Sequence, residues 1–168
     1  MPSAAPDDDE ITGSWSDWAT DRTLRFLIGG ALKLPYERRV PLFGKISRRV
    51  IAPLAGYTRR SRDNLARVWP DMPEAERRAI AERVSENAGR VLIENYSNPE
   101  FTRRAAHFDC SGPGLEVIEQ TRAAGRRVIV VSGHFGNYEA ARACLNARGY
   151  GMGGLYRPMS NAYFNSHY

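Results

Sequence analysis

The sequence has 168 residues, enough for one domain with a sizeable core, and its 42% hydrophobic and 26% charged content is close to globular averages. This composition excludes wholesale disorder. Two cysteines in a chain of this length exclude a disulfide scaffold and favour a reducing compartment, and no spacing matches a metal site, so we expect no metal and no cofactor.

The first 62 residues divide into an acidic tail and a basic arm. Residues 1–13 contain the run Asp7 to Glu10 and little that could be buried, which predicts a disordered tail. Between Arg22 and Arg62 there are 11 Lys or Arg and one acid, Glu37. The whole chain has a net charge of +5 although the tail holds four negative charges, so the rest of the chain carries 5 + 4 = +9, and we expect residues 14–62 to bind an anionic partner.

The apolar side chains of this arm favour a membrane surface as that partner. A helix is predicted from Trp15 to about Leu34, with Pro35 as a break. Its longest apolar run, Phe26 to Leu32, is too short to cross a bilayer, which needs about 20 residues. Aromatic and basic flanks are typical of an interfacial amphipathic helix, although a buried helix of a soluble domain or an ordinary solvated face would have a similar pattern. A nucleic-acid partner is not expected, since no recognition motif accompanies the charges.

Residues 63–168 alternate between helical and strand patterns. Apolar residues at four-residue spacing predict a long helix from about Asp71 to Asn98, and turn signals at 112–114 and 125 enclose a second helix. We predict strands at 106–110, at 128–131 and over 149–156, with a helix at 137–148. The fold class predicted is α/β, a mixed or parallel sheet with crossover helices, preceded by the helical N-terminal arm.

A chemically suggestive segment, Ser132 to Glu139, follows the apolar run Val128 to Val131. His134 falls where a strand would give way to a helix, the usual place for a ligand site in open α/β sheets. A neutral imidazole can accept a proton from a hydroxyl, and Glu139 can orient it and stabilise the imidazolium. Asn137 is a candidate helix cap. Without a G-x-S-x-G elbow around Ser132, a serine hydrolase is not favoured, and a purely structural histidine remains an alternative.

The segment His134-Phe135-Gly136-Asn137-Tyr138-Glu139 resembles the H-x4-(D/E) signature of the lysophospholipid acyltransferase superfamily. The H-F-x-x-x-E form is similar to that of the bacterial lipid A late acyltransferases, the lauroyl and myristoyl acyltransferase family. Three further blocks resemble the same family: Asn64-Leu65 with Trp69-Pro70, Gly114-Leu115-Glu116, and Tyr156-Arg157-Pro158 followed by Asn161 and Tyr163-Phe164.

This resemblance implies transfer of a fatty acyl group from acyl carrier protein to a hydroxyl of a lipid A precursor or related glycolipid or phospholipid. His134 and Glu139 would be the catalytic pair, and Arg157, Asn137 and Tyr156 would bind substrate. It also implies a location at the cytoplasmic face of the inner membrane, peripheral or anchored in the interface.

The resemblance further implies that residues 63–168 are the N-terminal part of the acyltransferase domain, because family members continue beyond the Tyr156-Arg157-Pro158 block. The domain is therefore expected to be incomplete. The alternative function is a non-catalytic, truncated membrane-binding fragment of such an enzyme.

Overall fold

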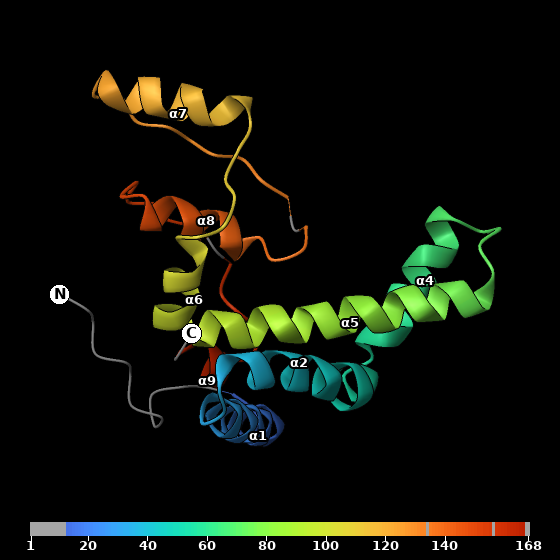
Figure 1. Ribbon diagram of the computed structural model, residues 1–168. Coiled ribbons are helices and arrows are strands. Elements are labelled where there is room, and N and C mark those ends of the chain that lie inside the picture. Colours follow the sequence, from blue (N-terminus) through green and yellow to red (C-terminus); the bar gives the residue numbers. More distant parts are fainter. Residues whose placement is uncertain (1–12, 134, 156, 167–168) are drawn as a thin grey trace. The chain divides into compact units, whose positions relative to one another are not determined.

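The computed structural model describes residues 13–133, 135–155 and 157–166, and the chain forms two compact units. Segments 1–34 and 153–168 make the first unit, and residues 35–152 make the second. Among the described residues the regular structure is helical throughout (Figure 1).

The first unit consists of helix α1, Trp15–Leu32, and the short helix α9, Ala162–Asn165, which pack together. A reciprocal capping box starts α1: Ser14 accepts a hydrogen bond from the Asp17 N–H, and the Asp17 carboxylate accepts one from the Ser14 N–H. Asn161 caps α9 by accepting from the Phe164 N–H, and its amide donates to the Asp17 carbonyl at 2.9 Å. The helix predicted from Trp15 is confirmed.

The second unit contains eight helical elements, counting the described residues alone. In chain order they are α2 Tyr36–Ile46, η2 Ser47–Ile51, α3 Ala52–Leu54, α4 Tyr57–Val68, α5 Glu74–Tyr96, α6 Asn98–Ala105, α7 Pro113–Ala123 and α8 Glu139–Ala147. The predicted helices at 71–98, 115–124 and 137–148 correspond to α5, α7 and α8.

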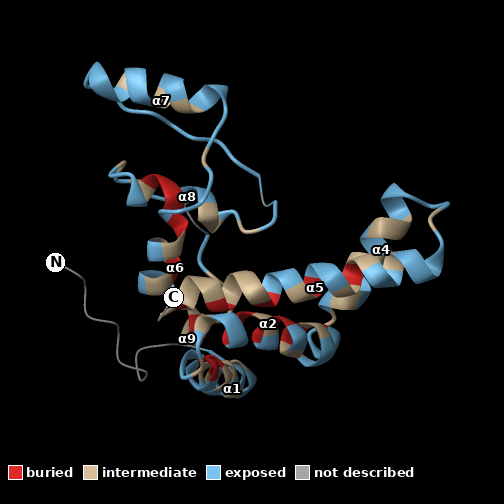
Figure 2. Ribbon diagram, viewed as in Figure 1, coloured by how far each residue is buried: buried red, intermediate tan, exposed pale blue. Residues whose placement is uncertain are grey.

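Helix α5 is the long element against which α2, η2 and α4 pack (Figure 1). Phe43 on α2 and Ile93 on α5 are fully buried. The helices approach closely at two glycines: a Cβ at Gly89 would lie 2.3 Å from the Cβ of Ser47, and one at Gly44 would lie 2.8 Å from the Cγ of Arg90. Buried residues are found on α2, α5, α6 and α8, whereas α4 and α7 have none (Figure 2).

The helical path from α2 to α3 continues past two prolines, a residue type that commonly interrupts a helix. Pro41 lies inside α2, and Pro53 lies in the first turn of α3. Between them η2 is a π-helical turn, in which the Ala52 N–H bonds to the Ser47 carbonyl. A wider turn is a common way to accommodate a local disruption of the α-helical ladder.

The predicted α/β fold is wrong for the described chain, because those residues contain no strand and no sheet. The run Val128–Val131 has no regular secondary structure, its backbone bonds to no other described backbone group, and Ile129 and Val131 are each 91% exposed. Residues 106–110 form a turn and irregular chain, as do 149–155. β-branched composition favours an extended backbone, but a strand also needs a neighbour to accept its hydrogen bonds.

Across the described ranges, no helix has both the length and the apolarity required to cross a membrane.

Candidate active site

The motif segment enters α8 through a tight turn at Gly136 and Asn137. Gly136 has a φ of 55°, in the left-handed region that glycine adopts without a steric penalty. The Asn137 side-chain oxygen then accepts a hydrogen bond from the Glu139 N–H at 3.1 Å, and the Asn137 carbonyl accepts one from the Ala140 N–H. Asn137 therefore satisfies backbone donors at the start of α8, as expected of a capping residue.

Glu139 is the first residue of α8, and its side chain is 22% exposed. Its Oε2 accepts a hydrogen bond from Nε of Arg142 one turn later, and a terminal nitrogen of the same guanidinium forms an ion pair with this oxygen, each at 2.6 Å. Within the described part of the chain no hydrogen bond to Oε1 is present. Arg142 was not among the predicted site residues, although its i,i+3 spacing from Glu139 is typical of a helix ion pair.

Two of the predicted site residues, His134 and Tyr156, lie outside the described residues. Asn137 and Glu139 belong to the second unit and lie next to each other at the start of α8. Arg157 belongs to the first unit and is exposed. Its binding role, like those of Asn137 and Tyr156, stays a prediction.

A second hydrogen bond from Asn137 reaches across to α5. The Asn137 amide donates to Oε2 of Glu94 at 2.6 Å, and the Tyr36 hydroxyl donates to Oε1 of the same carboxylate at 2.8 Å. Burial, together with this hydrogen bond, raises the pKa of Tyr36, so its hydroxyl remains a donor at ordinary pH. Sequence reasoning missed Glu94 and Tyr36, since 43 residues separate Glu94 from Asn137 and no periodicity links them.

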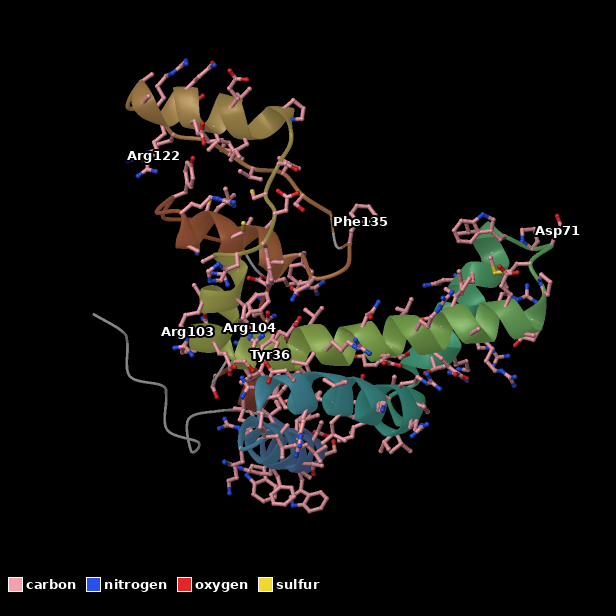
Figure 3. All side chains as sticks on the ribbon, in the orientation of Figure 1. Tyr36, Asp71, Arg103, Arg104, Arg122 and Phe135 are labelled. Atoms are coloured by element: carbon pink, nitrogen blue, oxygen red, sulfur yellow. The ribbon has the colours of Figure 1, made fainter. Side chains whose placement is uncertain are left out.

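Two arginine side chains lie over the ring of Tyr36, and one of them, Arg104, is labelled beside it in Figure 3. The guanidinium of Arg104 lies over the Tyr36 ring at 4.1 Å, and that of Arg39 lies at 5.3 Å. Both arginines also pair with Glu100 on α6, and Arg104 pairs with Glu37. The ion pairs fix the two guanidinium groups, and the cation–π contacts of these groups in turn restrict the motion of the Tyr36 ring.

A small apolar cluster lies behind the start of α8. Phe101 and Ala105 of α6 are buried against Ala143 of α8, with Tyr36 and Ala140 packed around them. The helix that carries Glu139 is thus attached to α6 by packing and to α5 by a hydrogen bond. Nearby, burial raises the pKa of the Cys144 thiol. No group of three or more metal-ligating side chains occurs among the residues that the structure describes.

Comparison with protein families gives a match that covers almost the whole sequence. Residues 10–168 match the family described as bacterial lipid A biosynthesis acyltransferase. The chain belongs to this family. No curated protein and no solved structure matches it.

Membership of the lipid A biosynthesis acyltransferase family confirms the resemblance seen in the sequence, and it makes acyl transfer the general chemistry of the chain. The matched range includes the segment from His134 to Glu139 and Arg157. The family does not by itself identify the acyl donor, the acceptor or the residues that act.

Proposed function

We propose that this acyltransferase transfers a fatty acyl group from acyl carrier protein to a hydroxyl of a lipid A precursor or a related glycolipid or phospholipid. The observation that carries the proposal is the family match over residues 10–168, which includes the H-x4-E segment. The partly exposed Glu139 carboxylate at the start of α8 supports it, because Oε1 accepts no hydrogen bond from the described residues.

In the proposed reaction His134 is the general base. As the acceptor oxygen attacks the thioester carbonyl, the imidazole takes the hydroxyl proton, and a new C–O bond forms. The tetrahedral intermediate then collapses with cleavage of the C–S bond, and the thiolate leaves with the proton from the imidazolium. Glu139 orients the imidazole and stabilises its positive charge, while Arg142 fixes the carboxylate.

The test is acyl transfer by the purified protein from a radiolabelled acyl carrier protein thioester. Separate reactions contain a lipid A precursor or phospholipid as acceptor, and a parallel set uses the coenzyme A thioester as donor. We expect label in the lipid A precursor, with acyl carrier protein as the preferred donor. Label from coenzyme A alone would contradict the assigned donor, and binding of lipid without transfer would favour the non-catalytic alternative.

We further propose that the protein acts at an anionic membrane surface, on the cytoplasmic face of the inner membrane. In the first unit, Trp15 and Phe26 of α1 are 79% and 80% exposed, and the guanidinium of Arg22 lies over the Trp18 ring. In the second unit, Leu54 is 85% exposed in a segment with exposed basic residues on both sides, Arg49, Arg59 and Arg60. Exposed apolar groups flanked by cations fit an interface with acidic lipids.

The Leu54→Asp substitution tests the membrane surface of the second unit. Because Leu54 is exposed, the fold should be kept, while the loss of an inserted side chain and the added charge should weaken binding to anionic vesicles by about tenfold or more. Vesicle sedimentation measures this. The matched control is Val117→Asp: Val117 is 59% exposed on α7, which also carries Glu116 and Glu119, and this change should leave binding as it is. Equal binding by Leu54→Asp and wild type would contradict the surface.

A further inference from the structure

The side chain of Asn137 makes two hydrogen bonds at the start of α8, one as an acceptor and one as a donor. Its oxygen accepts from the Glu139 N–H at 3.1 Å, and its amide donates to Oε2 of Glu94 at 2.6 Å. Asn137 thus connects the backbone of Glu139 to a carboxylate on α5. The 2.6 Å bond has an ionisable acceptor, and bonds of this class are stronger than neutral ones.

Glu94 is itself fixed at both oxygens. Tyr36 donates to Oε1, and Asn137 donates to Oε2, so rotation of the carboxylate would break one bond or the other. Tyr36 comes from α2. The guanidinium groups of Arg39, also on α2, and of Arg104, on α6, lie over its ring. Helices α2, α5 and α6 therefore all contribute to the frame that holds Glu94.

We propose that Glu94 is a positioning residue that holds Asn137, and through it Glu139, in the geometry needed at the start of α8. The catalytic consequence rests on the proposed acyl transfer, whereas the positioning does not. Glu94 acts on the reaction through Asn137 and touches no reacting atom.

The polarity of these groups allows a sharp test. In Glu94→Gln the side chain keeps its shape but loses its charge, and its NH2 group faces either the Asn137 amide, which only donates, or the Tyr36 hydroxyl, which can turn to accept. The bond from Asn137 is therefore lost or becomes a weaker, neutral one. Asn137→Asp places a carboxylate against the Glu94 carboxylate. The double variant, Glu94→Gln with Asn137→Asp, again pairs each donor with an acceptor. The introduced amide can accept from Tyr36 with its oxygen and donate with its nitrogen to the introduced carboxylate, which still accepts from the Glu139 N–H.

The first readout, hydrogen exchange of the backbone amides over residues 137–141, does not depend on activity. Exchange should be faster in both single variants, by roughly tenfold to a hundredfold in Asn137→Asp, where two carboxylates face each other, and by less in Glu94→Gln, where a neutral bond can replace the charged one. The double variant should return towards wild type. Glu86→Gln is the matched control, since Glu86 lies on the same helix and pairs with Arg48 and Arg90. It should leave exchange at 137–141 unchanged. Wild-type exchange in Glu94→Gln, or no recovery in the double variant, would overturn the proposal.

The second readout is the split between kcat and KM in acyl transfer. Misplacement of Glu139 should lower kcat in Glu94→Gln by about tenfold to a hundredfold, with KM changed much less, and the double variant should recover kcat. A loss confined to KM would contradict a positioning role in the chemical step. If wild type transfers no acyl group while exchange responds as expected, the proposed function fails and the positioning of Asn137 stands.

Discussion

Replacing His134 by alanine is expected to lower acyl transfer by about 10²- to 10⁴-fold, the usual contribution of a general base. Glu139→Gln should cause a loss of similar order, because the amide keeps the shape but no longer offsets the charge of the imidazolium. Turnover with saturating acyl carrier protein thioester measures both effects. Vesicle binding and far-UV circular dichroism of both variants should match wild type.

A second histidine gives the control for this experiment. His107 is exposed in the turn after α6, and His107→Ala should turn over at the wild-type rate. Wild-type turnover by His134→Ala or Glu139→Gln would remove that residue from the mechanism. A loss in His107→Ala equal to that in His134→Ala would show that the effect is not specific to the motif.

Gly89→Ala is expected to destabilise the second unit by about 1–3 kcal/mol, although alanine favours a helix by about 0.8–1.0 kcal/mol over glycine. The added methyl group would lie 2.3 Å from the Cβ of Ser47 and 3.0 Å from the Phe43 carbonyl oxygen. Neither atom can rotate away, since each belongs to the backbone or is bonded directly to it. Helices α2 and α5 would have to separate over the buried Phe43, and urea unfolding followed by circular dichroism measures the cost.

The same substitution in α1 should have the opposite sign. Gly29 is exposed, and a Cβ there would meet no atom within 4 Å. Gly29→Ala should therefore stabilise the first unit by about 0.5–1 kcal/mol through helix propensity alone. If Gly89→Ala were as stable as wild type, the close approach of α2 and α5 would be disproved.

The helices could be predicted because their signals are local. The break at Pro35 and the four-residue spacing of α5 each lie within a few residues of the structure that they determine. The absence of the predicted strands could not be foreseen in this way. Val128–Val131 has the composition of a buried strand, but pairing depends on a neighbouring segment that composition does not reveal.

In the candidate site, too, the features set by adjacent residues could be predicted and those set by tertiary contacts could not. The cap by Asn137 and the place of Glu139 at the start of a helix follow from adjacent residues, and both occur. Glu94 lies on a face of α5 that has no distinctive sequence pattern. Its role arises because Tyr36 of α2 and Asn137, just before α8, both donate to its carboxylate, which is tertiary structure. His134 and Glu139 as a catalytic pair stay a prediction.

The exposed run Val128–Val131 also affects how the protein must be handled. Four consecutive β-branched residues, with Ile129 and Val131 each 91% exposed and no backbone partner among the described residues, form a template on which the same segment of another copy can add. Arg126 and Arg127 directly before the run are charges of the kind that oppose such stacking. Aggregation should therefore increase when salt screens these two arginines, and dilute, low-salt buffers should keep the protein in solution.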